Sequence, residues 1–215
     1  MVALTDAVPS GRFDRDSTRR KCSRIHGWLT DPERDLLYNL AHNTLGGVIV
    51  EIGSWQGKST IALASGSKHA GRGRVYAVDP FCKSDAMKMI DGIYDVWAIT
   101  QVDDTYDKFM ANVAEADLWN DIVPIVAVSA EAVALYEQRH NYPIRLLFID
   151  GCHEGSYVQK DWDLWSPRVP SGGVIAFHDA IGETYPGVGK VAEHALNSAD
   201  WEVSRCDSIL YGTRR

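Results

Sequence analysis

The chain lacks the features that mark a membrane, secreted or zinc-binding protein. No stretch approaches the roughly 18 consecutive apolar residues of a membrane-spanning helix. Residues 1–20 have no basic region followed by an apolar one, so they predict a polar, partly disordered lead-in rather than a signal peptide. The cysteines are scattered, with no CxxC pair, at Cys22, Cys82, Cys152 and Cys206. This argues against a disulfide framework or a zinc site, and it predicts a cytoplasmic protein with reduced thiols and no membrane partner.

A basic stripe is also missing, which bears on nucleic-acid binding. The 22 basic and 29 acidic residues are mixed along the chain and leave a formal net charge of -7. Proteins that bind a phosphate backbone usually concentrate Lys and Arg on one face, so nucleic acid is excluded as an expected partner. The length of 215 residues suits one domain, and a hydrophobic content of 45% suffices for a sizeable core.

What the chain does contain is an alternation of apolar strands and helices. Runs of β-branched and apolar residues predict buried strands at 48–52, 74–79, 122–128, 145–150 and 173–177. Helices are predicted at 29–43, 58–67 and about 104–116, and two last strands at 201–203 and 208–211. This order indicates an α/β fold with a mostly parallel sheet, and the short final connection makes the last pair antiparallel.

One region interrupts the alternation. Residues 81–120 are too long for a single crossover and carry several aromatic side chains, which either contact a ligand or pack onto the sheet. We expect residues 1–24 to be the lead-in and residues 25–215 to form a single domain. The insertion at 81–120 is then a lid or an acceptor-binding segment.

The segment after the first strand, EIGSWQGKST at 51–60, predicts a ligand-binding turn. Gly53 and Gly57 are separated by one residue fewer than a P-loop requires, and Trp55 stands where the dinucleotide fingerprint has a glycine. The pattern that fits is E-x-G-x-x-x-G. In it, Glu51 can hold an ammonium group, such as that of a methionine moiety, while the next helix N-terminus favours a carboxylate. The alternative is a structural turn that happens to follow an acidic residue.

Asp79 and Ser129 follow the second and third strands. Asp79 lies 28 residues after Glu51 and is placed to accept hydrogen bonds from ribose hydroxyls. Ser129 is predicted either to cap the next helix or to contact an adenine or its exocyclic amine, and the two roles are compatible. Because open α/β sheets bind ligands at the carboxyl ends of their strands, both positions favour a nucleoside-like ligand.

Polar side chains also end the fourth and fifth strands. Asp150, His178 and Asp179 are expected to converge, because neighbouring parallel strands bring their carboxyl ends together. Carboxylates with an imidazole suit a divalent cation such as Mg²⁺, which would orient acceptor hydroxyls and lower their pKa. His153 is the candidate general base, since histidine titrates near neutral pH. The sequence allows His153 and His178 to exchange roles, and each also fits an ordinary loop or capping residue.

The helical stripe after this cluster is interpreted as core. Its members recur at helical spacing, and they are Tyr157, Val158, Asp161, Leu164 and Trp165. Asp161 and Asp163 are interpreted as charges on the helix surface rather than as ligands.

Together these segments resemble the class I S-adenosylmethionine (SAM)-dependent methyltransferases, and more narrowly the metal-dependent sugar O-methyltransferases of the macrocin and mycinose type. The motifs are VIVEIGSWQGKST (48–60), VYAVDPF (75–81), LLFIDGCHEGSYVQKDWDLW (146–165) and GGVIAFHDA (172–180). The opening GWLTDPERDLLYNLA (27–41) is similar too, so the resemblance runs from about residue 25 to the C-terminus. Mycobacterial enzymes that methylate mannose-containing polysaccharides look like a close functional analogue.

The resemblance implies a Rossmann-like, seven-stranded sheet that uses SAM and Mg²⁺ as cofactors. It implies SAM contacts at Glu51, Gly53, Ser54, Gly57, Ser59, Asp79 and Ser129. It implies metal ligands at Asp150, His178 and Asp179, with His153 as the catalytic base. The chain departs from the family pattern at two positions: relatives often carry an acidic residue in place of His178, and some carry an acidic residue, able to serve as base, in place of Cys152.

The expected activity is transfer of the SAM methyl group to a hydroxyl of a sugar, a glycoside, an oligosaccharide or a similar small molecule. Members of the group tend to be dimeric or larger, which adds a homodimer to the expected partners. One alternative is a metal-independent methyltransferase that uses His153 alone. The other is a SAM-binding accessory protein without transferase activity.

Overall fold

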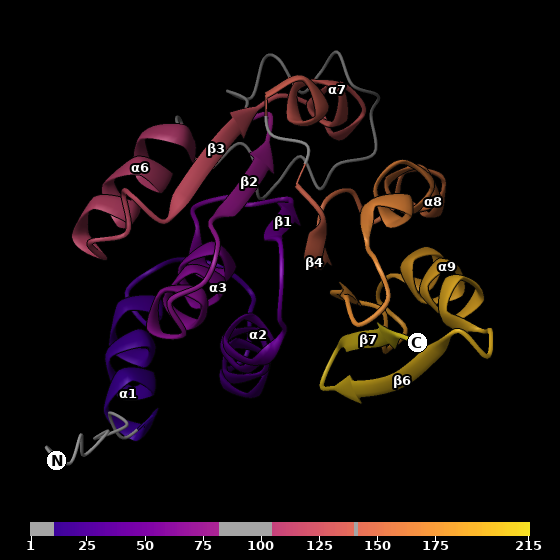
Figure 1. Cartoon of the computed structure of the whole chain (residues 1–215), viewed down its shortest axis with the longest axis horizontal. Coiled ribbons are helices and arrows are strands. Elements are labelled where there is room, and N and C mark those ends of the chain that lie inside the picture. The colour runs from indigo at the N-terminus through magenta and orange to yellow at the C-terminus, as the bar shows by residue number, and fades with distance from the viewer. Residues whose placement is uncertain (1–10, 82–104, 140–141) are drawn as a thin grey trace, which may run out of the picture.

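The computed structural model describes residues 11–81, 105–139 and 142–215. Within them, a seven-stranded sheet has the order β3-β2-β1-β4-β5-β7-β6 (Figure 1). The strands are β1 (Val48–Ile52), β2 (Val75–Asp79), β3 (Ile122–Val126), β4 (Ile144–Ile149), β5 (Val174–Phe177), β6 (Trp201–Cys206) and β7 (Ile209–Arg214). Strands β1 to β5 pair in parallel, and β7 runs antiparallel to both β5 and β6. The predicted Rossmann-like sheet is confirmed.

Helices cover both faces of the sheet. One layer contains α1 (Gly11–Cys22), α2 (Asp31–Asn43), α3 (Lys58–His69) and α6 (Thr105–Glu115). The other contains α7 (Ser129–Arg139), α8 (Gly155–Trp165) with the short 3₁₀ helix η1 (Ser166–Arg168), and α9 (Pro186–Leu196). Figure 1 shows α1, α2 and α3 on one side of the strands and α8 and α9 on the other. No helix in the described ranges is long and apolar enough to cross a membrane.

The central strand β1 shows why the sheet needs both layers. Ile49 packs into the core beneath α2 and α3, whereas Val50 and Ile52 pack into the core beneath α8 and α9. Every residue of β1 is buried, including Glu51. A central parallel strand is covered on both faces, so an acidic residue within it must find its polar partners inside the protein.

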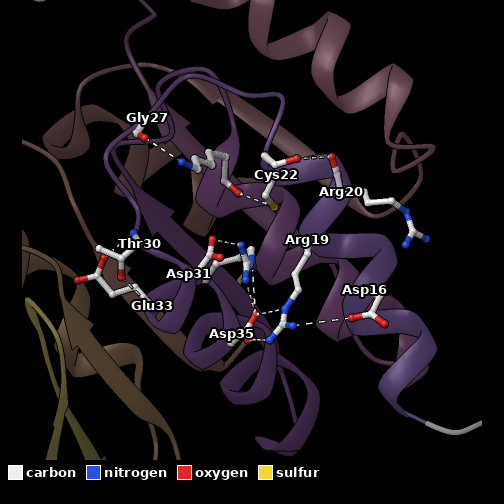
Figure 2. A network of polar contacts seen from close by, with 12 residues as sticks. Asp16, Arg19, Arg20, Cys22, Gly27, Thr30, Asp31, Glu33 and Asp35 are labelled. Carbon is white, nitrogen blue, oxygen red and sulfur yellow. Dashed lines mark hydrogen bonds and ion pairs between the residues drawn. The ribbon is translucent and has the colours of Figure 1, made fainter.

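The N-terminal region is more regular than the sequence indicated. Residues 11–22 form α1, and Arg19 pairs with Asp35 of α2, as Figure 2 shows. The expectation of a partly disordered lead-in is therefore wrong for this segment, because α1 packs Cys22 into the core under α3. Residues 1–10 lie outside the described residues.

The region expected to be an insertion is described only in part. Helix α6 confirms the helix predicted at about 104–116. Residues 82–104, which include the part interpreted as a lid or an acceptor-binding segment, lie outside the described residues.

A capping box begins α2. The Thr30 hydroxyl accepts a hydrogen bond from the Glu33 amide at 3.3 Å, and the Glu33 carboxylate accepts one from the Thr30 amide at 2.9 Å. Thr30 is therefore the N-cap of α2. The hydrogen bond from the Thr30 amide also limits the conformations of the Glu33 side chain.

Helices α2 and α3 cross so closely that Gly66 has no room for a side chain. A Cβ on Gly66 would stand 2.2 Å from the backbone oxygen of Tyr38. We predict that Gly66→Ala lowers the free energy of unfolding by about 1–3 kcal/mol, the usual cost of overpacking, although alanine favours a helix by about 1 kcal/mol over glycine. Urea denaturation measures the change. The control is Glu193→Ala on the exposed face of α9, and an unchanged midpoint for Gly66→Ala would contradict the close crossing.

Candidate active site

A cavity of about 990 Å³ opens at the carboxyl ends of the parallel strands. Its wall contains the segments that follow β1 to β5, at 52–55, 78–80, 127–129, 150–155 and 178–179. The α1–α2 loop at 26–29 and residues 184–187 also line it, and individual residues of α3, α6 and α8 add to the wall. This volume is at the upper end of the range of small-molecule sites, so it has room for a cofactor and an acceptor together.

Neighbouring protein atoms leave no room for a side chain at the glycines after β1. Gly53 has a φ of +88°, and a Cβ on it would stand 2.0 Å from the backbone oxygen of Asp150. Gly57 has a φ of +89°, and its Cβ would stand 3.0 Å from the ring of Phe109. Gly53, Ser54 and Ser59 line the cavity, whereas Gly57 shapes the turn from outside it.

Glu51 lies beneath this loop and outside the cavity wall. Its carboxylate is fully buried and accepts a hydrogen bond from the Thr60 hydroxyl. The other oxygen, Oε1, has no hydrogen-bond partner in the described part of the chain. Burial raises the pKa of Glu51 to about 7, against the opposing effect of the Ser59 and Thr60 hydroxyls. The sequence placed Glu51 against a ligand ammonium group, and the structure places it under the first turn of α3.

Asp79 lines the cavity and also holds the loop. Its Oδ2 accepts hydrogen bonds from the amides of Ser54 and Trp55, both at 2.9 Å. Its Oδ1 accepts one from the amide of Phe81 at 2.7 Å. Burial raises the pKa of Asp79, and these backbone hydrogen bonds oppose the rise. Asp79 therefore combines the position predicted for a ribose contact with a role in loop geometry that the sequence did not reveal.

Ser129 begins α7 and lines the cavity beside α8. Its Oγ accepts a hydrogen bond from the indole nitrogen of Trp165 at 2.9 Å. Asp161 of α8 lines the same cavity and is only 6% exposed, so its interpretation as a surface charge is wrong. Asp163 is exposed, as expected. The sequence did contain the signal, because Asp161 shares its helical stripe with Val158 and Trp165.

The predicted polar cluster forms at the ends of β4 and β5. His178 Nδ1 lies 2.9 Å from Asp150 Oδ1 and 3.3 Å from Asp179 Oδ2. His153 Nε2 lies 3.0 Å from Asp179 Oδ2 and 3.9 Å from Asp150 Oδ1. Ligand atoms of Asp150, His153 and Asp179 come within 4.8 Å of one another. Two carboxylates and an imidazole at this spacing fit a divalent cation.

A carboxylate from α2 contacts the cluster through the second ring nitrogen of His178. Glu33 is 1% exposed, and its Oε2 lies 3.4 Å from His178 Nε2. Its Oε1 accepts hydrogen bonds from the amide and the hydroxyl of Ser208, at 2.9 and 2.6 Å, in the turn between β6 and β7. Sequence reasoning missed Glu33 and Ser208. The Thr-x-x-Glu pattern predicts a helix cap, and it carries no information on a contact 145 residues away.

These carboxylates hold His178 as an imidazolium. Burial by itself lowers the pKa of His178, but the charge of Asp150 and the hydrogen bonds to Asp150, Asp179 and Glu33 raise it to about 12. Burial likewise raises the pKa of Glu33, yet its hydrogen bonds, led by that with His178, bring it down to about 2. An imidazolium is protonated on both ring nitrogens, so His178 in this state has no lone pair for a metal or a proton.

His153 is the more exposed of the two histidines of the cluster. Its side chain is 32% exposed, and its ring stacks on Tyr185 with the centroids 4.2 Å apart. Its bond to Asp179, together with that from His178, holds the pKa of Asp179 well below the ordinary value despite burial. The structure thus brings together all four predicted residues of the cluster, with His153 partly exposed on the cavity wall and His178 buried among carboxylates.

A profile described as a methyltransferase domain matches residues 50–180, which is more than half of the chain. The chain therefore belongs to this methyltransferase family, and the enzyme class predicted from the sequence is confirmed.

Solved O-methyltransferases share the fold. TomG from Streptomyces achromogenes, solved with SAM, has a TM-score of 0.64 at 14% identity, over 100% of this chain and 92% of that one. An O-methyltransferase from Bacillus cereus, solved with S-adenosylhomocysteine (SAH), has a TM-score of 0.63 at 14% identity, over 97% and 94%. CalS11, a TDP-rhamnose 3'-O-methyltransferase of calicheamicin biosynthesis, has a TM-score of 0.58 at 13% identity, over 95% and 94%.

The Glu33–His178 pair predicts a pH window of greatest stability. The pKa of Glu33 falls from 4.5 to about 2, so its contribution is complete above about pH 4.5 and is lost as the pH falls through 2. The pKa of His178 rises from 6.5 to about 12, so its contribution is complete below about pH 6.5 and is lost as the pH rises towards 12. The contacts of His178 with its carboxylates, Asp150 first and Glu33 among them, therefore contribute most between about pH 4.5 and 6.5.

Glu33→Gln tests this window. Breaking a buried ion pair costs roughly 3–5 kcal/mol, and we expect a loss of that order at about pH 5.5 that shrinks towards about pH 3. Denaturant unfolding at each pH measures it. Glu115→Gln, which removes a carboxylate paired with Arg24 on the surface, is the matched control and should change stability by less than about 1 kcal/mol. Parallel pH profiles for wild type and Glu33→Gln would show that the pair is not ionised.

Proposed function

We propose that the protein is a SAM-dependent O-methyltransferase that acts, with Mg²⁺, on a hydroxyl of a sugar, a glycoside or a similar small molecule. The observation that carries the proposal is the convergence of Asp150, His153 and Asp179 within 4.8 Å on the wall of a cavity large enough for two ligands. Family membership supports methyl transfer. The TomG and Bacillus cereus complexes support SAM as donor, and CalS11 supports a sugar acceptor.

SAM is proposed to lie along the carboxyl ends of the central strands. The N-terminus of α3 favours the methionine carboxylate, because the first backbone amides and the dipole of a helix attract negative charge. Asp79 is suited to the ribose hydroxyls, since carboxylate oxygens can accept more than one hydrogen bond each. The residues proposed to contact the cofactor are Gly53, Ser54, Ser59, Asp79 and Ser129, with Glu51 and Gly57 supporting the loop from outside the wall.

Asp150 and Asp179 are proposed to hold the cation. When bound, Mg²⁺ supplies positive charge that lowers the pKa of the acceptor hydroxyl. His178 was the third ligand expected from the sequence, but both of its ring nitrogens face carboxylates. We therefore assign His178 to the support of Asp150 and Asp179 from behind.

His153 is proposed to accept the proton of the acceptor hydroxyl. In the reaction the acceptor oxygen bonds to the methyl carbon, the carbon–sulfur bond breaks with its electron pair moving to sulfur, and the hydroxyl proton must leave. An ionised Asp179 can only accept a hydrogen bond, so His153 Nε2 carries the proton of that bond and Nδ1 has the lone pair. The remaining contribution of the protein is to position donor and acceptor and to exclude water.

A metal-independent methyltransferase is the second candidate. The observation that favours it is the His153–Asp179 pair, which forms an oriented base without any ion. In that case Asp150 serves only to pair with His178.

Methyl transfer from labelled SAM to a panel of sugars, glycosides and catechols tests the proposal. We expect product on a sugar hydroxyl in Mg²⁺ and its loss in EDTA. Product that persists in EDTA would favour the metal-independent enzyme. SAM binding with no product on any acceptor would contradict the proposal and favour an accessory protein.

Variants of the cluster distinguish the role of the base from the role of the metal ligands. Removing a general base typically lowers kcat by about 10²–10⁴-fold, so we expect such a loss for His153→Gln with SAM affinity unchanged. Asp150→Ala is expected to abolish the Mg²⁺-dependent reaction and to leave SAM binding largely intact. His194→Gln, on the exposed face of α9, is the matched control. Full activity of Asp150→Ala would exclude the metal-assisted reaction.

A further inference from the structure

Trp28 exposes its indole ring on the wall of the cavity. It lies in the α1–α2 loop and is 65% exposed. An indole buries a large apolar area when it packs, so tryptophan is highly buried on average. A tryptophan left open beside a ligand cavity gains that burial when a ligand packs against it.

Two further rings stand beside Trp28. The ring centroid of Trp55 is 6.2 Å away, and that of His26 is 5.2 Å away with its ring edge-on. All three residues line the cavity, and we call them the aromatic platform. Isolated apolar side chains are ordinary on a protein surface, whereas contiguous ones mark binding sites.

Hydrogen bonds on both sides of Trp28 hold the loop that carries it. The Lys58 Nζ at the start of α3 donates to the Gly27 carbonyl at 2.9 Å, which is the dashed line at Gly27 in Figure 2. Two residues after Trp28, the Thr30 amide donates to Glu33 Oε2 at 2.9 Å. The backbone of Trp28 is therefore fixed between two anchored residues before any ligand binds.

The second anchor joins the platform to the acidic cluster. The same Glu33 Oε2 lies 3.4 Å from His178 Nε2. Two residues of chain reach at most about 7 Å, so the Cα of Trp28 lies within that distance of the Cα of Thr30. The loop thus connects the platform to His178 through one carboxylate and two residues of chain.

Trp55 is held in a backbone conformation that bulky side chains rarely adopt. Its φ is +47°, and its amide donates to Asp79 Oδ2 at 2.9 Å. Glycine or asparagine would take this left-handed conformation at a lower cost in free energy. Such backbone outliers cluster at ligand-binding sites, which points to a role for the Trp55 ring in the cavity.

The arrangement of the two indoles fits a sugar better than a flat aromatic ring. The face of an indole is electron-rich and attracts the partial positive charge of C–H groups. The planes of Trp28 and Trp55 are inclined by 49°, so both cannot stack face to face on one flat ring. A puckered pyranose presents C–H groups in more than one plane and carries its hydroxyls around the rim.

We propose that the aromatic platform is the acceptor subsite: Trp28 and Trp55 pack against the C–H face of a pyranose ring and so position a rim hydroxyl for methyl transfer. The assignment of the sugar as methyl acceptor rests on the proposed function. Trp28 is then a specificity-determining residue, because it favours a ring with an apolar face over an acyclic polyol.

NMR of the indole N–H groups locates the contact without turnover. The chain has 7 tryptophans, and each gives one indole signal, which replacement of that tryptophan by phenylalanine assigns. The probes are the methyl glycosides of glucose, galactose, mannose and rhamnose, titrated into protein saturated with SAH. We expect at least one of them to shift the signals of Trp28 and Trp55. The signal of Trp119 should stay in place, because Trp119 is 49% exposed but is not among the described residues that line the cavity.

Two substitutions measure the contribution of the Trp28 ring. Trp28→Ala should weaken the binding of that glycoside about 10-fold, which is typical for loss of a stacking contact, and Trp28→Phe, which keeps a smaller ring, should weaken it by less. The dissociation constant of SAH should stay unchanged in both variants, which shows that the cavity remains folded. Trp119→Ala removes another exposed indole and should keep the wild-type affinity for the glycoside.

The outcomes for the platform and for methyl transfer are separate. An unchanged glycoside affinity in Trp28→Ala would overturn the platform, as would titrations in which no glycoside, or only catechol, shifts the Trp28 and Trp55 signals. Methyl transfer to a sugar with wild-type KM by Trp28→Ala would overturn the platform and leave the proposed function standing. Glycoside binding that depends on Trp28, without methyl transfer to any sugar, would overturn the proposed function and support the platform.

Discussion

The carboxyl edge of the sheet is organised around one buried imidazolium. His178 contacts Asp150 at the end of β4, Asp179 beside it at the end of β5, and Glu33 at the start of α2. Through Ser208, Glu33 extends the network to the β6–β7 turn. One cation among three carboxylates leaves an excess of negative charge, part of which faces the cavity. Such a wall favours a divalent cation or the sulfonium of SAM.

Hydrogen bonds within the protein hold the segments of the cavity wall in place before a ligand binds, although these segments are distant in the sequence. Asp179 has a φ of +53°, an unfavourable conformation for a residue with a side chain, and its amide is held by the Ser208 hydroxyl at 3.3 Å. At the other side of the cavity, Asp79 ties down the loop after β1 with two backbone hydrogen bonds. Groups that are already in place cost little reorganisation during reaction, which is the main contribution that a methyltransferase can make to an in-line transfer.

The fold and most of the site were predictable because their signals are local. Gly53, Asp79 and Asp150 each end a recognisable strand, and the rule that ligands bind at the carboxyl ends of parallel strands places them together. The contact of Glu33 with His178 was not predictable, since the residue pattern of α2 does not indicate that Glu33 will contact the end of β5. Asp161 was predicted to be solvated because acidic side chains are mostly exposed, although its place on the stripe with Val158 and Trp165 indicated burial.

The two histidines show most clearly what the sequence alone did not determine. The sequence offered His153 and His178 for the same two roles, and spacing alone could not separate them. The structure separates them by burial, because His178 is 5% exposed and enclosed by carboxylates while His153 stacks on Tyr185 at the cavity surface. The enclosure of His178 therefore depends on Glu33 of α2 and on Ser208 of the β6–β7 turn, which are far from it in the sequence.

A crystal structure of the protein with SAH and Mg²⁺ would locate both ligands in the cavity. We expect the SAH sulfur to face the Asp150–His153–Asp179 group, the ribose to lie at Asp79, and the metal to lie between Asp150 and Asp179 with His178 behind it. SAH bound in the reverse direction, or a metal ligated by His178, would show that the proposed arrangement is wrong.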